Sequence, residues 1–458
     1  MASENFCQIP IPDNRKERCE QLRQKFLNKF GEEPAFFARA PGRVNLIGEH
    51  VDYCGYSVLP MAIEQDILMA VSPDDSGKLS FVNVDPNYDD FTGDVMQIRI
   101  TKDDPQWYKY MLCGVLGVKE NFCSLIVQGF KAVVSGTIPP SAGLSSSSAL
   151  VCCAALAMLQ ANSWPMSKEK LCEICASCEH YIGTEGGGMD QAISLTASPG
   201  KAKHIEFNPL RTTDVQLPKN VAFVVSNSLA QMNKAATPYF NIRVVECRIA
   251  AQILAKSRPS LQWREIKRLG EVQSRLGFSL DAMLGLVEST LHKEPYSKAE
   301  VCKLLGISPE ELAETSLSTN TRDVESFLLY QRATHVYSEA KRVLAFKSVC
   351  DSQPPDALEQ LGRLMDESHA SCRDMYECSH PDLDTLVELC KKNGAQGSRM
   401  TGAGWGGCAV SIVHSDRVDT LLAGVREQYY SASSDRAGKV ASALFATVPG
   451  GGAAYYSV

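Results

Sequence analysis

The sequence predicts an α+β fold of two domains. Segments typical of strands and segments typical of helices both occur, but without the regular βαβα alternation of a doubly wound sheet. The chain has 458 residues, which is enough for about two or three domains. Its composition, 44% hydrophobic and 22% charged, is that of a globular protein and excludes a largely disordered, collagen-like or coiled-coil chain.

The first third of the chain is rich in β-branched and alternating apolar residues. This pattern predicts strands at 35–40, 67–72, 79–84 and 95–100. Apolar residues at helical spacing then predict helices at 107–118, 149–161 and 168–182.

The same criteria divide the second half. They predict strands at 221–226, 408–413 and 440–448. They predict helices at 241–256, 321–346 and 357–372. We place the domain boundary between residues 215 and 216, giving domains 1–215 and 216–458, with a polar helical insertion near 280–320.

Charge and hydropathy restrict the class of partner. Lys and Arg number 46 and Asp and Glu 53, and the net charge of −7 provides no field that would attract nucleic acid or anionic lipid. The longest strongly apolar run, 149–159, is too short to cross a bilayer. Residues 1–12 do not resemble a signal peptide. We therefore expect a cytoplasmic monomer that binds small molecules.

The 17 cysteines are scattered, and a cytoplasmic protein keeps them reduced. Cys172, Cys175 and Cys178 form a C-x-x-C-x-x-C run, which raises the question of a metal or iron–sulfur site. No second cluster supplies the remaining ligands at a recognised spacing. Because this spacing puts the three thiols along one face of a helix, we interpret them as part of a buried stripe.

The stretch 132–167 contains no charged residue, and at its centre lies Pro139-Pro140-Ser141-Ala142-Gly143-Leu144-Ser145-Ser146-Ser147-Ser148. Proline and glycine predict a loop here, and the run at 149–159 predicts a helix directly after it. Free N–H groups and the positive dipole end at the start of that helix would bind phosphate without Lys or Arg. The lysine of a P-loop is missing. A flexible serine-rich linker is the alternative.

A second segment packs four ionisable groups into ten residues: Pro41-Gly42-Arg43-Val44-Asn45-Leu46-Ile47-Gly48-Glu49-His50-Val51-Asp52-Tyr53. Carboxylates and an imidazole can hydrogen-bond several sugar hydroxyls at once, so this segment predicts a hydroxyl-rich ligand. Arg43 could instead face a transferring phosphoryl group, because a guanidinium suits the developing charge. A solvated turn with incidental ion pairs is the alternative.

The third segment is Met400-Thr401-Gly402-Ala403-Gly404-Trp405-Gly406-Gly407-Cys408. So many glycines indicate that another backbone or a ligand approaches closely. Gly402, Gly404 and Gly407 have the spacing of a dinucleotide fingerprint, but a strand rather than a helix is predicted to follow. We therefore exclude dinucleotide binding at this segment.

In this order along the chain, the three segments resemble those of the GHMP small-molecule kinases, and within them the galactokinase family. The segment 41–53 is similar to the galactokinase signature almost residue for residue. The resemblance extends from Pro41 to Cys408 and implies a GHMP architecture. That architecture has an N-terminal α+β domain, a C-terminal domain with a ferredoxin-like core, and an active site in the cleft between them. It also implies ATP as co-substrate and Mg²⁺ as metal.

The resemblance assigns a nucleotide site. It implies that the ATP phosphates are bound by Gly143, Leu144, Ser145, Ser146 and Ser147. It implies that Mg²⁺ is bound by Ser147 and Glu179. Trp107 lies in a stretch similar to the family's W-x-x-Y-x-x-G-V near the base, although by itself it fits a core aromatic. Asn233 and Lys234 either line the cleft or belong to an exposed loop.

The resemblance also assigns an acceptor site. It implies that sugar hydroxyls are bound by Arg43, Glu49, His50, Asp52 and Asp190. Asp190 lies in Gly186-Gly187-Gly188-Met189-Asp190-Gln191, which resembles the family's G-x-M-D-Q. In that family the aspartate removes or orients the proton of the anomeric hydroxyl. A carboxylate beside Arg43 stays ionised at neutral pH, so we predict that Asp190 and Arg43 are catalytic.

Two departures from the family pattern concern the acceptor. Gly186 and Gly188 stand where many galactokinases have Cys and Ile, and the interval from Glu179 to Asp190 is one residue shorter. The family's Y-N-x-R-R reads Phe240-Asn241-Ile242-Arg243-Val244, with Tyr239 displaced by one position. Both changes favour a pocket widened for a bulkier C2 substituent. The predicted activity is therefore transfer of phosphate from ATP to the C1 hydroxyl of N-acetylgalactosamine, with galactose as a second substrate.

Other activities remain alternatives. The chain could be a galactokinase proper, or a non-catalytic sensor that binds galactose and ATP and then a regulator. Such sensors can lose residues of the phosphate loop, whereas here Arg43, Gly143 and Asp190 are all present, which favours an enzyme. A mevalonate or homoserine kinase is disfavoured because Glu49-His50-Val51-Asp52 resembles a sugar-binding signature.

Overall fold

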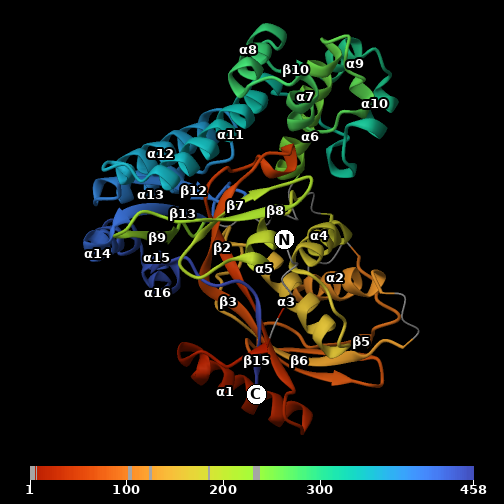
Figure 1. The fold of residues 1–458 in the computed structure, drawn as a ribbon, viewed down its shortest axis with the longest axis vertical. Coiled ribbons are helices and arrows are strands. Elements are labelled where there is room, and N and C mark those ends of the chain that lie inside the picture. Colours follow the sequence, from red (N-terminus) through yellow and green to blue (C-terminus); the bar gives the residue numbers. More distant parts are fainter. Residues whose placement is uncertain (1–5, 7, 102–105, 123–125, 184–185, 231–237) are drawn as a thin grey trace.

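The computed structural model describes the whole chain except residues 1–5, 7, 102–105, 123–125, 184–185 and 231–237. Sheets and helices are mixed as the α+β prediction requires, and two larger sheets organise the molecule (Figure 1). The first sheet has the strand order β1-β15-β2-β3-β6-β4-β5. Its strands are β1 (Gln8–Ile9), β2 (Phe36–Ile47), β3 (Leu59–Asp74), β4 (Lys78–Asn83), β5 (Phe91–Asp94), β6 (Gly129–Gly136) and β15 (Ala454–Ser457).

Strand β2, which pairs antiparallel with β3, contains the first part of the segment 41–53, and we call this segment the signature. The pairing register shifts between Pro41 and Arg43 and again between Asn45 and Ile47. Such bulges bend a strand and redirect its side chains, and they accommodate a proline that a regular central strand excludes. The predicted strand at 35–40 therefore continues to Ile47, so that Arg43 lies on the strand itself.

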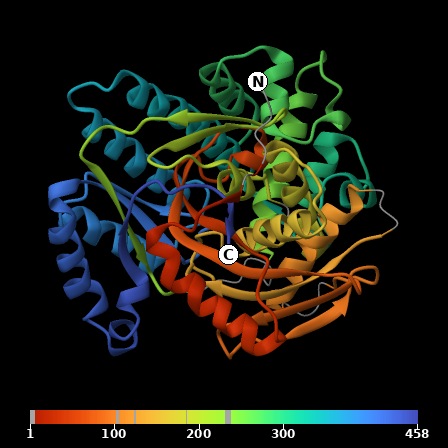
Figure 2. The same ribbon diagram turned by 60° about the horizontal axis from the view of Figure 1, so that its bottom comes forward.

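Helices cover both faces of the first sheet. Helix α1 (Lys16–Phe30) lies against one face (Figures 1 and 2). Its residues Cys19, Leu22 and Phe26 pack on side chains of β2, β3 and β6. The other face is covered by α2 (Trp107–Glu120), α3 (Ser146–Ala161), α4 (Lys168–Cys178), η3 (Glu179–Ile182) and α5 (Met189–Thr196). These helices agree with the three predicted at 107–118, 149–161 and 168–182.

Helix α3 has no amphipathic face, because nearly all of its residues are buried. It packs against α2 on one side and against β2 and β3 on the other. A helix that is apolar all round belongs inside a layer of other elements, which explains the long uncharged stretch of the sequence. Burial on all sides fixes the start of α3, and this start positions the serine-rich loop before it.

The second sheet has the order β12-β13-β9-β14 and is antiparallel. Its strands are β9 (Val221–Asn227), β12 (Gly397–Thr401), β13 (Cys408–His414) and β14 (Leu444–Thr447). It packs against α12 (Ala357–Asp374), α13 (Pro381–Lys392) and α14 (Val418–Val425). The glycine-rich segment is the connection between β12 and β13, so it emerges at one end of this sheet.

A helical region extends from the second half of the chain, as the sequence predicts near 280–320 (Figure 1). Its helices are α6 (Tyr239–Lys256), α7 (Leu269–Leu276), α8 (Leu280–Thr290), α9 (Lys298–Leu305) and α10 (Pro309–Thr315). Helix α11 (Leu329–Ser352) packs against α6, α8 and α12, and so connects this region with the second sheet.

Three predicted elements are wrong in detail. Residues 95–100 form a turn at Val95 and Met96 followed by irregular chain rather than a strand, because the Asp94 carboxylate accepts a hydrogen bond from the Met96 amide at the end of β5. Helix α11 begins at Leu329 rather than at 321, since a short strand, β11 (Ser326–Phe327), precedes it. The predicted strand at 440–448 begins as a single helical turn, α16 (Val440–Ala443), before β14.

The predicted boundary between residues 215 and 216 lies in the connection from β8 (Arg211–Val215) to β9. There the chain passes from a two-stranded sheet of β7 (Ala202–Glu206) and β8 to the second large sheet. The C-terminal strand departs from the division into 1–215 and 216–458. Strand β15 returns to the first sheet and pairs antiparallel with β2, between Ala454 and Arg39 for example.

The cysteine run is buried as a stripe. Cys172, Cys175 and Cys178 lie on α4 and each is at most 2% exposed. In the described ranges no group of three or more His, Cys, Asp and Glu side chains has an arrangement that could hold a metal ion. No helix in the described part of the chain is both long and apolar enough to span a membrane.

Candidate active site

The three glycine-bearing segments meet where two cavities join. The first cavity, of about 440 Å³, is lined by the loop 141–148 and by Tyr88, Trp107 and Tyr110. We call it the loop cleft. The second, of about 40 Å³, is lined by Glu49, His50, Asp52, Tyr53 and Phe240, and we call it the signature pocket. Residues shared by both cavities are Arg43, Glu179, Asp190 and Ala403.

The start of α3 forms one wall of the loop cleft. Ser145, directly before the helix, has a left-handed backbone with φ of 60°, and Gly143 has φ of 74°. The first-turn N–H groups of a helix have no partner within the helix and carry the positive end of its dipole. Because Ser146, Ser147 and Ser148 of this turn line the cleft, the wall suits a phosphate group.

The glycine-rich segment after β12 packs directly on this loop. A Cβ atom on Gly402 would lie 2.3 Å from the carbonyl oxygen of Gly143, and one on Gly143 would lie 2.8 Å from that of Thr401. Both glycines also have a positive φ. The close approach of another backbone, which the sequence predicts here, therefore joins the two halves of the chain beside the loop cleft.

Arg43 and Asp190 face each other where the two cavities join. The Arg43 Nε and Nη2 atoms lie 2.9 and 2.8 Å from Asp190 Oδ1, and Nη1 donates to the Gly143 carbonyl at 2.5 Å. The Arg43 side chain is 5% exposed and that of Asp190 is 21% exposed, so the carboxylate is the more accessible of the two. Asp190 also lies in the first turn of α5, where a negative charge is favoured.

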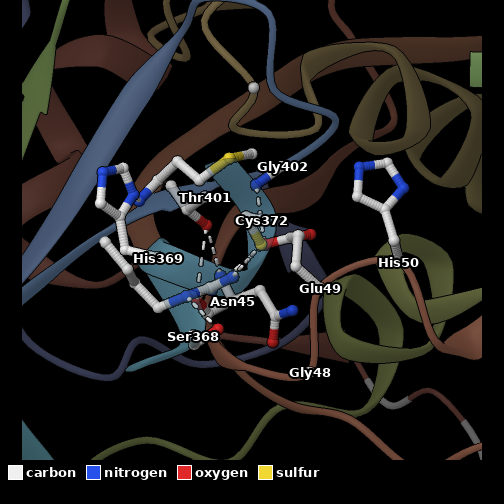
Figure 3. Close-up of polar contacts among 12 residues, drawn as sticks. Asn45, Gly48, Glu49, His50, Ser368, His369, Cys372, Thr401 and Gly402 are labelled. Carbon is white, nitrogen blue, oxygen red and sulfur yellow. Dashed lines mark hydrogen bonds and ion pairs between the residues drawn. The ribbon is translucent and has the colours of Figure 1, made fainter. Parts of the chain in front are cut away.

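Glu49 is tied to the second half of the chain. Its Oε2 atom accepts from Arg399 Nη1 and from the Gly402 amide, each at 3.2 Å, and Figure 3 shows the carboxylate turned toward Gly402. Burial raises the pKa of Glu49, and the neighbouring arginines Arg399 and Arg43 oppose that rise. The position of Glu49 therefore depends on β12 as well as on the signature itself.

A second buried carboxylate supports the backbone of the signature. The Oε1 atom of Glu339, on α11, accepts from the amides of Gly48 and Glu49 at 2.9 and 3.3 Å and from Ser368 Oγ at 2.6 Å. Burial alone would raise the pKa of Glu339, but Arg342 and other neighbours outweigh it and hold the pKa at about 2. Sequence reasoning missed Glu339, since one glutamate in a long helix carries no signal of this role.

His50 has a left-handed backbone with φ of 60° and contributes its ring to the wall of the signature pocket. Its Nε2–H group donates to the Ala403 carbonyl at 3.0 Å, and Nδ1 accepts from the Tyr53 hydroxyl at 2.9 Å. The Tyr53 hydroxyl is in turn 2.7 Å from the Tyr376 hydroxyl. Protein groups therefore orient both ring nitrogens in this structure.

Phe240, and not the displaced Tyr239, occupies the position of the family's tyrosine in the signature pocket. Phe240 lines the signature pocket and packs against the rings of His50 and Tyr53, with ring centroids 5.6 and 5.5 Å away. Tyr239 is 47% exposed and stacks on Trp405 instead. The pocket wall therefore has an aromatic ring without a hydroxyl at this position.

The glycines before Asp190 do not all widen the pocket. A Cβ atom on Gly187 would lie 2.4 Å from the Asp52 carboxylate and from the Tyr53 amide, so Gly187 permits the close approach of that turn. Gly188 has φ of 101° and caps α5. A Cβ atom on Gly186 would meet no atom of the described residues within 4 Å. The space predicted from the loss of the Cys and Ile side chains is thus present at Gly186 and not at Gly188, where a Cβ atom would lie 3.2 Å from the Ala176 Cβ atom.

The remaining predicted residues belong to the loop cleft. Ser147 and Glu179 both line it, and Glu179 is 6% exposed. Trp107 is 9% exposed and donates from Nε1 to the Asp89 carbonyl at 2.8 Å. It is therefore both a packed aromatic and a part of the cleft wall. Asn233 and Lys234 lie outside the described residues.

Comparison with known proteins assigns the chain to a family. Residues 24–73 match the family model described as the galactokinase galactose-binding signature. Residues 109–198 match the GHMP kinases N terminal domain, and 356–431 match the GHMP kinases C terminal domain. Galactokinase of Dictyostelium discoideum is 41% identical over 447 residues, which cover 92% of this chain and 89% of the relative. The chain belongs to the galactokinase family.

Other relatives agree. Galactokinase of Saccharomyces cerevisiae is 36% identical, with 88% of this chain and 87% of the relative covered. The crystal structure of Lactococcus lactis galactokinase complexed with galactose superposes with a TM-score of 0.75 at 24% identity, covering 95% of this chain and 99% of that chain. This structural likeness shows that the chain has the same fold as that galactokinase.

Membership in the family makes the chain a sugar kinase of galactokinase type, and such kinases use ATP as co-substrate. The relatives named above are called galactokinases, and none of these names mentions N-acetylgalactosamine. The comparisons therefore support galactose better than the N-acetylgalactosamine specificity that the sequence predicts.

Proposed function

We propose that this galactokinase-family chain transfers the γ-phosphoryl group of ATP to the anomeric hydroxyl of a galactose-configured sugar, giving the α-1-phosphate by direct in-line transfer. The observation that carries the proposal is the Arg43–Asp190 pair, which lies where the loop cleft joins the signature pocket. A nucleotide in the cleft and a sugar in the pocket would meet at this pair.

In the proposed mechanism, Asp190 accepts or orients the proton of the anomeric hydroxyl. The sugar oxygen forms a bond to the γ-phosphorus while the bond between that phosphorus and the leaving oxygen of ADP breaks. Arg43 lies 2.9 Å from Asp190 and donates to the Gly143 carbonyl, so it holds the proton acceptor beside the phosphate loop. Phosphoryl transfer requires mainly such positioning and charge stabilisation.

Metal binding at the loop cleft is also part of the proposal. Ser147 provides a hydroxyl and Glu179 a carboxylate, and oxygen donors of these kinds suit Mg²⁺. Bound there, the ion would neutralise charge on the phosphate oxygens. The serine N–H groups at the start of α3 would bind the remaining phosphate oxygens.

Galactose is the acceptor that the names of the relatives favour. N-acetylgalactosamine is a second candidate, because two features of the signature pocket favour additional bulk. Gly186 borders open space among the described residues, and Phe240 lines the pocket with a ring that has no hydroxyl. Both features are compatible with galactose as well, so the same enzyme could use both sugars.

The test is release of ADP by the purified chain with ATP and Mg²⁺, comparing galactose, N-acetylgalactosamine and N-acetylglucosamine, with Asp190→Ala as the control. We expect turnover of galactose-configured sugars that the variant loses. Binding of sugar and ATP without turnover would favour the sensor. Turnover of galactose alone would remove the second acceptor.

A further inference from the structure

A third cavity of about 990 Å³ opens beside the signature pocket, and we call it the outer cavity. It shares five lining residues with the signature pocket: Asp52, Tyr53, Gly186, Gly187 and Gly188. It shares no described lining residue with the loop cleft. The signature pocket therefore lies between the two larger cavities, with phosphoryl transfer on one side and the outer cavity on the other.

The reaction restricts which parts of the acceptor can face the outer cavity. The anomeric hydroxyl must lie at Asp190, and the glycines that border the outer cavity directly precede Asp190 in the chain. The C2 substituent is vicinal to the anomeric hydroxyl, so in a sugar that binds with C2 rather than the ring oxygen toward the outer cavity it lies next to these glycines. Gly186 leaves open space there. An extended group on C2 would thus enter the outer cavity, which is as large as a complete ligand pocket.

The outer cavity has a basic wall. Lys267 and Arg268 line it, with Lys267 exposed and Arg268 partly buried. Neither side chain forms an ion pair with another part of the chain that the structure describes. The Arg268 Cδ atom lies 3.8 Å from where a Cβ atom on Gly55 would be, so Arg268 adjoins the turn that carries Asp52.

Both acidic residues in the described part of the lining are already engaged. Glu173 is exposed and pairs with Lys170 at 3.3 Å, and Asp52 accepts from the Met189 amide at 3.4 Å. Arg248 adds a third cation, and its Nη1 atom donates to the Ser316 carbonyl at 2.8 Å. Among the described lining residues, cations thus outnumber the engaged anions, which favours a negatively charged group in the outer cavity.

We propose that the acceptor site takes galactosamines whose C2 nitrogen carries an extended acyl chain that ends in a carboxylate. The chain lies in the outer cavity, and the carboxylate binds at Lys267 and Arg268. The inference rests on the proposed function, since the reaction at the anomeric hydroxyl is unchanged. It adds a substrate class, N-acyl galactosamines with an anionic end, to the simple sugars.

The test compares two acceptors of nearly the same size: N-succinylgalactosamine, which ends in a carboxylate, and N-succinamoylgalactosamine, which ends in a neutral amide. Galactose and N-acetylgalactosamine are measured beside them. We expect both long acceptors to be phosphorylated, with kcat/KM for the carboxylate about threefold or more above that for the amide. The ratio should fall as salt is added, because the cations are partly exposed.

Variants assign the effect to the basic wall. The double variant Lys267→Gln with Arg268→Gln should reduce the carboxylate-to-amide ratio to about one. Its kcat/KM for galactose should not change, because neither residue lines the signature pocket or the loop cleft. Lys303→Gln, an exposed lysine on α9 outside the cavity lining, is the matched control and should keep the ratio.

Each contrary outcome points to a different failure. No turnover of any sugar would overturn the proposed function itself. If the chain phosphorylates galactose, but its kcat/KM for both long acceptors is less than about one-hundredth of its kcat/KM for galactose, the inference is overturned and the proposed function is not. Equal rates for the carboxylate and the amide in the unmodified chain would overturn its anionic part. A ratio that persists in the double variant would overturn the assignment to Lys267 and Arg268.

Discussion

The Arg43 guanidinium contacts two parts of the candidate active site at once. It pairs with Asp190 and donates to the Gly143 carbonyl of the phosphate loop. A single rigid, always charged group therefore sets the distance between the proposed proton acceptor and the loop proposed to bind phosphate. Asp190 is the more exposed partner, and so the one that can reach the acceptor hydroxyl.

Asp190→Asn tests the role of this carboxylate. The amide keeps the shape of the side chain but cannot accept the proton, so we expect kcat to fall by about 100-fold or more. Sugar affinity, measured by calorimetry without turnover, should change far less than kcat. An Asn variant that turns over at the normal rate would contradict the catalytic role.

Glu339 does not line the signature pocket in the described structure, but it holds the backbone amide of Glu49, which does. Because its carboxylate holds the amides of Gly48 and Glu49, we expect Glu339→Gln to raise the KM for the sugar while the KM for ATP changes little. Weakening a buried charged hydrogen bond should also cost about 1–3 kcal/mol of stability. Steady-state kinetics with each substrate varied separately, together with urea unfolding, measures both effects.

Glu359→Gln is the matched control, because Glu359 is exposed on α12. It should leave both KM values unchanged. If Glu339→Gln lowers stability but leaves the KM for the sugar as it is, then Glu339 is structural and does not position the signature.

At the scale of elements, the loop before α3 depends on its contact with the segment after β12. Gly143 has φ of 74°, and a Cβ atom there would lie 2.8 Å from the Thr401 carbonyl oxygen. Neither backbone can move easily, because α3 is buried on all sides and β12 is a strand of the second sheet. The loop proposed to bind phosphate is therefore held by elements from both halves of the chain.

Gly143→Ala should disturb this contact. We expect a rise in the KM for ATP of about tenfold or more and a loss of about 1–3 kcal/mol in stability, because the substitution adds both backbone strain and a clash. Nucleotide binding and urea unfolding measure the two effects. Gly438→Ala is the control, since its Cβ atom would meet nothing within 4 Å and its backbone is helical. Equal behaviour of the two variants would contradict the role of the contact.

At the scale of the whole molecule, a buried polar cluster joins the signature to the second half of the chain. His335 on α11 donates from Nε2 to the Glu49 carbonyl at 3.0 Å, and its Nδ1 accepts from Ser371 Oγ at 2.8 Å. Burial lowers the pKa of His335 to about 4, so the ring is neutral at pH 7. Glu339, one helical turn away, stays ionised.

The sign of the pH dependence follows from these two groups. The pKa of His335 is about 4 in the fold against an ordinary value of 6.5, so the unfolded chain binds the proton first. Its contribution to stability is present above pH 6.5 and is lost as the pH falls toward 4. Glu339, with a pKa of about 2 against 4.5, adds a further loss below pH 4.5.

His335→Gln should therefore flatten the loss of stability between pH 6.5 and pH 4. One proton corresponds to at most about 1.4 kcal/mol per pH unit, which urea unfolding across this range can resolve. His414→Gln, on the surface beside Asp416, should leave the slope unchanged. A variant at His335 with the original slope would mean that other groups control the acid response.

The sequence by itself determined the α+β class, most helices and the motifs of the family, because turn residues, apolar periodicity and glycine content act locally. It also identified Arg43 and Asp190 as a pair, through motif resemblance. It ended β2 too early, since Pro41 and Gly42 indicate a break where the structure has a bulge. The apolar and β-branched residues at 95–100 predicted a strand, because the sequence pattern does not reveal the hydrogen bond by which the Asp94 carboxylate stabilises a turn there.

Only the tertiary structure decided which groups meet. Glu339 and Arg399 reach the signature from about 290 and 350 residues along the chain, and no local pattern specifies such contacts. The space at Gly186, the close approach at Gly187 and the outer cavity likewise depend on how α4, α6 and the turn at Asp52 pack. Local sequence sets the conformation of a segment, whereas burial against distant segments sets the shape and charge of a site.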